Sequence, residues 1–152
     1  MDNKSQALRK LKLVIGRAER VDFPDAGIFG VHAKIDTGAY RSSVWASDIR
    51  EENGTLRFRL LGPSAAQYSG QDCETTEYAR VEVENSFGQK EERYSIYLRV
   101  KVGAKTTKTT FTLANRGVKT YPVLIGRKLL RGRYIVDVSE GEPLTDEEAE
   151  DL

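Results

Sequence analysis

Apolar and polar residues alternate along several stretches of this chain, and a period of two is typical of strands buried on one face. The clearest case is Leu56-Arg57-Phe58-Arg59-Leu60, in which arginines separate three apolar residues. Runs rich in β-branched and aromatic residues extend the signal to most of the chain. Together these patterns predict strands over residues 11–20, 30–36, 42–46, 56–60, 78–84, 93–102, 105–113 and 133–138.

Turn residues separate the predicted strands. Asn85-Ser86-Phe87-Gly88-Gln89 and Gly103-Ala104 are short polar or small-residue connections, so residues 78–113 are predicted to form a meander of hairpins. Residues 23–27 form a further turn, and residues 62–76, rich in Gly, Ser, Ala and Gln, are predicted to be irregular. Residues 127–130 are predicted to form one short helix. The chain is therefore expected to be all-β with a short C-terminal helix.

Composition limits the class of protein. A chain of 152 residues with 39% hydrophobic and 31% charged residues can bury one modest core, so we predict a single domain over residues 1–139. No apolar run is long enough to span a bilayer, and no signal peptide is evident at the start. The single cysteine, Cys73, cannot form an internal disulfide. We therefore expect a cytoplasmic protein.

Charge is distributed unevenly along the chain. Residues 140–152 contain seven acidic residues and no basic one, so residues 1–139 hold 24 basic and 16 acidic residues, a net charge of +8. A run of this kind predicts an acidic, disordered tail, although it could also rest on the basic body. The basic residues are interspersed with Glu and no nucleic-acid motif is present, so no nucleic-acid partner is predicted.

Candidate chemistry lies in Lys34-Ile35-Asp36-Thr37-Gly38-Ala39, where a predicted strand runs directly into an Asp-Thr-Gly turn. On its own this tripeptide is a common turn former, and Asp36 could have only that role. Aspartic peptidases place a carboxylate at a strand end beside a small residue whose N–H can donate to it, as Gly38 could. The Thr37 hydroxyl could tie this turn to a counterpart. We predict Asp36, Thr37 and Gly38 as the catalytic residues.

A second run, Pro122-Val123-Leu124-Ile125-Gly126-Arg127-Lys128-Leu129-Leu130, follows about ninety residues later. Its glycine would let this strand pass close behind the catalytic turn. We therefore expect Ile125, Gly126 and Arg127, together with Ala39, to support the site, with Arg127 as a structural ion-pairing residue. The chain has one Asp-Thr-Gly and is too short for two catalytic lobes, so the second carboxylate is predicted to come from a second copy in a homodimer.

These runs occur in the order found in a known family. With Val14-Ile15-Gly16-Arg17, Glu92-Arg93 and Phe111-Thr112-Leu113-Ala114-Asn115-Arg116, the chain resembles retropepsin-like aspartic peptidases that are often labelled ATP-dependent zinc proteases. They include the RimB-like protease encoded beside the RimK glutamate ligase. Retroviral relatives carry an acidic residue after the Asp-Thr-Gly-Ala sequence that can pair with the Arg of the Gly-Arg motif. This chain has Tyr40 there, so the sequence leaves the partner of Arg127 open.

The resemblance implies a retropepsin-like closed β-barrel, an aspartic endopeptidase activity and a flap over the site at Ser86, Phe87, Gly88 and Gln89. It also implies peptide or protein substrates, some extended by glutamate, and a functional link to an ATP-grasp glutamate ligase. The final strand could join an intersubunit sheet. The alternative is a non-catalytic retropepsin fold that binds peptides or dimerises.

The zinc and ATP labels find no counterpart in the residues. The chain has one histidine, His32, one cysteine and no His-Glu-x-x-His helix, so a conventional zinc peptidase site is not predicted. A Gly-Lys-Ser/Thr phosphate loop is absent as well. We therefore predict neither a metal nor another cofactor, and we interpret His32 as a strand residue.

Overall fold

Strands form most of the described chain, as the alternating pattern predicts. The structure, a computed structural model, describes residues 11–84, 87–115 and 121–141. Most of the predicted acidic tail, residues 142–152, and the predicted flap residue Ser86 lie outside the described residues.

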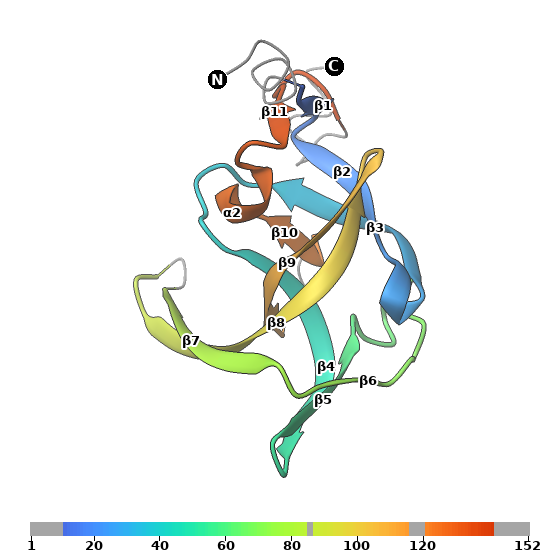
Figure 1. Ribbon diagram of the computed structural model, residues 1–152, viewed down its shortest axis with the longest axis vertical. Coiled ribbons are helices and arrows are strands. Elements are labelled where there is room, and N and C mark those ends of the chain that lie inside the picture. Colours follow the sequence, from blue (N-terminus) through green and yellow to red (C-terminus); the bar gives the residue numbers. More distant parts are fainter. Residues whose placement is uncertain (1–10, 85–86, 116–120, 142–152) are drawn as a thin grey trace, which may run out of the picture.

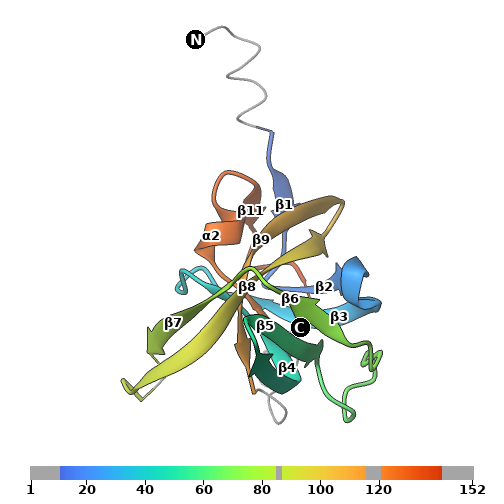
Figure 2. The ribbon, with the colours of Figure 1, turned by 60° about the horizontal axis from the view of Figure 1, so that its bottom comes forward.

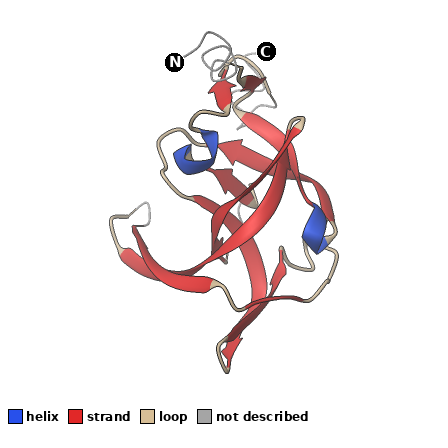
Figure 3. Cartoon of the chain, in the orientation of Figure 1, coloured by secondary structure: helices blue, strands red, loops and turns tan. Residues whose placement is uncertain are grey.

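The helical segments are the short 3₁₀ turn η1 (Pro24–Ala26) and the helix α2 (Arg127–Leu130), the latter as predicted (Figure 3). The strands are β1 (Leu13–Ile15), β2 (Ala18–Phe23), β3 (Ile28–Ile35), β4 (Ser42–Glu52), β5 (Thr55–Leu60), β6 (Cys73–Thr75), β7 (Tyr78–Glu84), β8 (Lys90–Val102), β9 (Lys105–Ala114), β10 (Val123–Ile125) and β11 (Tyr134–Val136).

A ring of strands closes into a barrel in the order β10, β3, β2, β8, β9 and β4 (Figure 1). The short strand β10 completes the ring, because it pairs in parallel with β3 and antiparallel with β4. Closure removes the free edges that an open sheet would expose. The prediction of an all-β closed barrel with one short helix is therefore confirmed.

The core fills the inside of this barrel with apolar residues from alternate strand positions. On β3, for example, Val31, Ala33 and Ile35 are buried. Phe23 and Phe111 meet across the interior with their ring centroids 5.4 Å apart in an edge-to-face arrangement. Burial of this inner face holds β3 and β10 in place, and the two strands carry the candidate site on their C-terminal ends.

The predicted first strand, residues 11–20, is wrong as one unit, because β1 and β2 are separate strands. The backbone N–H of Arg17 donates to the Glu140 carbonyl, and a Cβ at Gly16 would lie 2.5 Å from the Glu140 backbone. The C-terminal segment therefore interrupts the strand at this point. β1 then pairs in parallel with β11 of the same chain, near both described ends (Figure 1). A role of β11 in an intersubunit sheet stays a prediction.

Two hairpins extend from the barrel, β4–β5 and β7–β8 (Figure 2). β4 runs to Glu52 rather than ending at residue 46 as predicted, because a bulge between Ser47 and Arg50 lets the strand continue past its buried part. The predicted irregular stretch contains β6, which pairs with β5 but is too short to show a period. In the described residues, no helix is long and apolar enough to cross a membrane.

Candidate active site

The Asp-Thr-Gly turn begins where β3 ends. Asp36 is half-buried, and its backbone N–H donates to the Ile125 carbonyl at 2.8 Å. Ile125 and Ile35 lie side by side in the parallel β10–β3 pair, so the turn starts from two adjacent strand ends. The Ala39 N–H closes the turn by donating to the Asp36 carbonyl at 3.3 Å. The catalytic candidate thus lies on a backbone fixed at both sides.

Gly38 makes the contact that the sequence predicts. Its backbone N–H donates to Asp36 Oδ1 at 3.0 Å. A Cβ at this position would lie 3.2 Å from the same oxygen, so glycine lets the amide approach the carboxylate closely. An N–H aimed at one carboxylate oxygen fixes the orientation of the carboxylate. The side chain of Thr37 is exposed, and its predicted bond to a counterpart turn remains a prediction.

Gly126 lies directly behind the turn. Its N–H donates to the Ser42 hydroxyl at 2.9 Å. A Cβ here would lie 2.5 Å from the Arg41 carbonyl oxygen and 2.8 Å from that of Tyr40, both closer than real contacts allow. Only glycine therefore lets the end of β10 pass so close to the segment that follows the Asp-Thr-Gly turn.

Arg127 holds the turn by its backbone carbonyls. The guanidinium Nη1 donates to the Gly38 carbonyl at 2.9 Å and to the Thr37 carbonyl at 3.2 Å. The Arg127 N–H donates to the Ala39 carbonyl at 2.8 Å, and its guanidinium carbon lies 6.0 Å from the centre of the Tyr40 ring. The partner left open by the sequence is thus the turn itself, and these carbonyls take the place of the expected ion pair.

A cleft of about 790 Å³ opens between this turn and the β7–β8 hairpin. Its turn side includes Asp36, Gly38 and Arg127, and its hairpin side includes Val83 and Arg93. The half-buried Asp36 therefore borders this open space, and a strand pair lies opposite it. This arrangement can bring a bound carbonyl group to the carboxylate.

The predicted flap coincides with the end of the β7–β8 hairpin. The last pair of the hairpin ladder joins Glu84 to Lys90, so Phe87, Gly88 and Gln89 belong to its connection. Gly88 has a φ of +77°, a left-handed conformation that favours glycine in a tight turn. Phe87 is 87% exposed. The assignment of these residues as a flap and its closure over a substrate both stay predictions.

At its base the hairpin is tied to β4 by side chains. Arg80 Nη2 lies 3.0 Å from Glu51 Oε1, and the Arg80 guanidinium also packs over the Tyr94 ring at 5.4 Å. A hydrogen bond from Tyr78, assisted by the charge of Arg80, lowers the pKa of Glu51 below its usual value. Besides the pairing of β8 with β9, an exposed polar cluster therefore ties the base of the hairpin to β4.

The sequence did not single out four residues that line the cleft, namely Lys34, Arg41, Ser43 and Thr112. They come from three strands and one loop, and only the pairing register brings them together. A single basic or small residue is too common on strands and loops to indicate a site, so the local sequence contains no signal for these four. In the part of the chain that the structure describes, no three His, Cys, Asp or Glu side chains gather in a group that could hold a metal ion.

A closed barrel with an Asp-Thr-Gly turn opposite a hairpin defines a retropepsin-like protein. A model of the retropepsin-like aspartic endopeptidase RimB family matches residues 14–146, and the chain belongs to this RimB-like family. The resemblance inferred from the sequence is thereby confirmed.

Curated relatives and a solved structure are also similar to this chain. Probable alpha-L-glutamate ligases of Shewanella pealeana and Shewanella halifaxensis are each 31% identical to this chain over 133 residues, which cover 85% of the chain and 29% of the relative. The chain thus spans less than a third of the length of these curated relatives. A crystal structure of a Legionella pneumophila protein of unknown function is similar, with a TM-score of 0.61 and 27% identity, over 86% of this chain and 96% of that one.

Proposed function

We propose that this protein is an aspartic endopeptidase that acts as a homodimer, with one Asp36 from each subunit. One observation carries the proposal: a half-buried aspartate at the end of β3 accepts the N–H of Gly38 and opens into a cleft faced by a hairpin. A turn-forming aspartate would need neither the cleft nor the close passage of Gly126 behind it. Membership of the retropepsin-like family supports the same class of reaction.

The dimer follows from the number of carboxylates. The chain has one Asp-Thr-Gly, whereas the reaction needs two carboxyl groups that share one proton. Paired copies of Asp36 on a two-fold axis would meet this need, and each subunit would present the same face. The exposed Thr37 lies beside Asp36 in the sequence, where a second copy of the turn could accept or donate a hydrogen bond.

In the proposed mechanism the dyad moves protons and the cleft orients the peptide. The ionised carboxylate takes a proton from water as the water oxygen bonds to the peptide carbon, while the protonated carboxyl group donates its proton to the carbonyl oxygen. The C–N bond of the tetrahedral intermediate then breaks as its nitrogen receives a proton from the dyad, and the carbonyl forms again as one hydroxyl group of the intermediate returns its proton to the dyad. One shared proton remains on the pair. The N–H of Gly38 keeps each carboxylate oriented throughout.

For substrates, we propose peptides or proteins bearing glutamate extensions. The first support is the net charge of +8 on residues 1–139, which attracts acidic chains. The second is that the relatives are named probable alpha-L-glutamate ligases and are more than three times as long as the matched segment, which suggests that this domain works beside a glutamate ligase. A functional link to an ATP-grasp glutamate ligase is part of the proposal.

Replacement of Asp36 by asparagine tests the reaction class. We expect Asp36→Asn to abolish hydrolysis of a glutamate-bearing peptide while circular dichroism stays unchanged, because the amide has a similar shape but cannot share the proton. Wild-type activity should survive a metal chelator. Loss on chelation and recovery with zinc would contradict the proposal. Peptide binding without any cleavage by the wild type would instead favour the non-catalytic module.

A further inference from the structure

One face of the barrel forms the floor of the cleft. In the sheet register Lys34 on β3 is opposite Leu124 on β10, Leu124 is opposite Ser43 on β4, and Ser43 is opposite Thr112 on β9. Directly paired residues of neighbouring strands project to the same face, and all four line the cleft. Since neighbouring strands lie about 4.8 Å apart, the row spans roughly 14 Å, the length of about four extended residues.

A cation lies at one end of this row, and a second one borders it. Lys34 ends the row on the β3 side, two residues before Asp36. Arg41 immediately precedes β4 and also lines the cleft. Its carbonyl is held close against Gly126, so its backbone position is set by the same contact that supports the turn. Both cations thus belong to the fixed side of the cleft, close to the candidate catalytic carboxylate.

The other two cations of the cleft already have partners. Arg127 donates to the carbonyls of the catalytic turn, and Arg93 pairs with Glu91 on its own strand at 3.1 Å. Lys34 and Arg41 differ, because neither has a carboxylate partner among the described residues. In the described part of the chain, two cations on the floor of the cleft therefore form no salt bridge.

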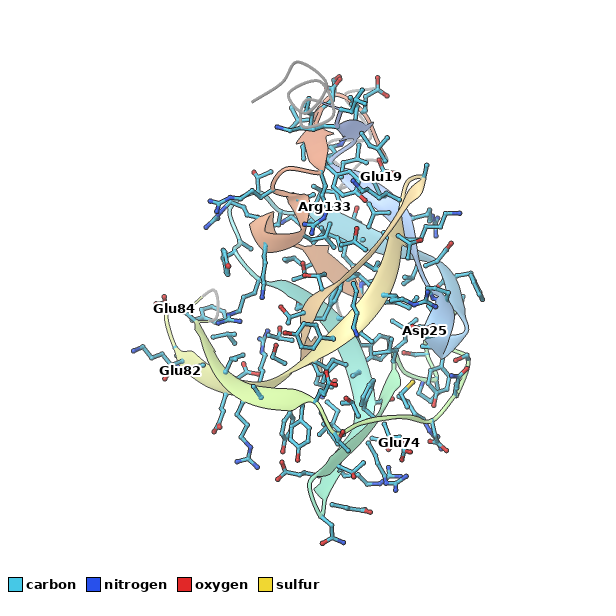
Figure 4. All side chains as sticks on the ribbon, viewed as in Figure 1. Glu19, Asp25, Glu74, Glu82, Glu84 and Arg133 are labelled. Atoms are coloured by element: carbon cyan, nitrogen blue, oxygen red, sulfur yellow. The ribbon has the colours of Figure 1, made fainter. Side chains whose placement is uncertain are left out.

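The acidic residues of the cleft lie elsewhere. Apart from Asp36, they are Glu82 and Glu84 on β7, on the hairpin side (Figure 4). Glu82 lies 3.6 Å from Lys90 across the hairpin. The cleft is therefore asymmetric, because the two cations that form no salt bridge with a described residue lie on the floor, whereas Glu82, Glu84 and Arg93 lie on the hairpin opposite. An extended peptide between them would expose its downward side chains to Lys34 and Arg41.

We propose that Lys34 and Arg41 are specificity-determining residues that bind the carboxylate side chains of a substrate next to the bond that is cleaved. This inference rests on the proposed peptidase function and assigns the residues that select the substrate. A charged hydrogen bond to a carboxylate is stronger than a neutral one, and Arg41 can donate two at once. The small side chains of Ser43 and Thr112 leave room above the floor on the side of Leu124 away from Lys34.

Two peptides of equal length and shape test the selection. One carries glutamates on both sides of the cleavage site, and the other carries glutamines in their place. We expect Lys34→Met and Arg41→Met each to lower the ratio of kcat/KM for the Glu peptide over the Gln peptide about tenfold, mainly through KM, since each loses a charge-assisted hydrogen bond. Lys108→Met is the matched control, because Lys108 packs over Tyr97 and does not line the cleft. It should keep the ratio of the wild type.

Three results would overturn the inference. An unchanged ratio in both variants would do so, even if both peptides are cleaved more slowly, because the two cations would then serve closure of the hairpin through Glu82 and Glu84. An equal fall in Lys108→Met would do so as well, because it would show an effect of overall charge. The third would be an unchanged ratio in Arg41→Met together with a Lys34→Met protein that fails to fold.

A binding measurement separates this inference from the proposed reaction. Fluorescence anisotropy of the labelled Glu peptide with Asp36→Asn protein needs no cleavage. We expect a second substitution, Lys34→Met or Arg41→Met, to raise the Kd about tenfold, whereas Lys108→Met should leave it near that of Asp36→Asn. If the wild type cleaves nothing, the peptidase proposal fails and this measurement alone decides the role of the two cations. An equal Kd in all variants contradicts it.

Discussion

The two sides of the cleft are built in different ways. On one side, the Asp-Thr-Gly turn is held by backbone hydrogen bonds to the end of β10 and the start of α2, and by the guanidinium of Arg127. On the other side, β7 pairs only with β8 among the described strands, and its base is tied by the side chains of Arg80, Glu51 and Tyr78. The turn is joined to the neighbouring elements by main-chain bonds, whereas β7 is joined to β4 by exposed side chains.

This difference suggests a division of tasks. Catalytic groups must keep their geometry within a fraction of an ångström, and backbone bonds to a closed barrel provide that. A hairpin that admits and covers a substrate must instead open at low cost, and an exposed ion pair contributes little stability. We therefore expect substitutions behind the turn to change folding and catalysis together, and substitutions at the hairpin base to change access.

The largest effect should come from Gly126. Gly126→Ala would place a Cβ against the carbonyls of Arg41 and Tyr40, so we expect a loss of about 2–4 kcal/mol in the free energy of unfolding. Urea denaturation followed by circular dichroism measures it. Gly132→Ala is the control, because its Cβ would meet nothing within 4 Å and its φ of +77° alone should cost about 1–2 kcal/mol. A smaller loss at Gly126 than at Gly132 would contradict the close passage behind the turn.

A smaller effect is expected from Arg127. Arg127→Met removes two charged hydrogen bonds from an exposed side chain, so the free energy of unfolding should fall by only about 1 kcal/mol. The turn that carries Asp36 would lose the two hydrogen bonds from Arg127. We therefore expect kcat to fall more than the decrease in the folded fraction explains. Arg127→Lys should rescue kcat only in part, because an ammonium can donate to both carbonyls as Nη1 does but lacks the planar guanidinium that faces the Tyr40 ring. Arg131→Met, on the exposed surface past α2, should leave kcat unchanged. Equal kcat values for Arg127→Met and wild type would show that Arg127 does not hold the turn in its catalytic geometry.

The smallest effect on stability should come from Arg80. Arg80→Met breaks the tie to Glu51, so amide hydrogen exchange should accelerate in β7 and in the paired part of β8 while the barrel strands keep their protection. Lys90→Met, which loses the longer contact to Glu82 near the hairpin tip, is the control and should have a weaker effect. If β7 exchanges at the same rate in Arg80→Met, Lys90→Met and the wild type, the polar cluster does not hold the hairpin.

Acid should have the same effect as Arg80→Met. The pKa of Glu51 is lowered in the folded protein, so the tie is present at neutral pH and is lost as the pH falls through that lowered value. Hydrogen exchange of the hairpin, corrected for its intrinsic pH dependence, should therefore approach that of Arg80→Met at a pH well below the usual pKa of a glutamate. In the Glu51→Gln variant this pH dependence should be absent. Persistence of the same pH dependence in Glu51→Gln would assign it to another group.

Much of this architecture could be predicted from the sequence because its signals are local. Alternation within each strand and the turn residues between strands predicted β5, β7, β8 and β9 closely. The Asp-Thr-Gly turn and the later Gly-Arg run could be recognised because glycine has a physical role in each. The bond from Gly38 to Asp36 follows from the turn and was expected in advance.

Other features depend on pairings between distant segments. The interruption at Gly16 arises from the backbone at Glu140, more than a hundred residues away. The partner of Arg127 is a pair of backbone carbonyls, for which side-chain identities give no signal. The row of Lys34, Ser43 and Thr112 exists only in the register of the closed barrel. A local pattern cannot reveal a contact that global closure creates.

Mixing wild-type and Asp36→Asn subunits tests the central claim of a shared active site most directly. The total concentration is kept where sedimentation shows wild-type dimers, and energy transfer between labelled copies verifies that subunits exchange. If each site needs two Asp36 carboxylates, activity should follow the square of the wild-type fraction, so an equal mixture should retain about one quarter of the activity. A linear decrease, with half of the activity retained in the equal mixture, would show that one Asp36 suffices and would contradict the dimeric aspartic peptidase proposed for this chain.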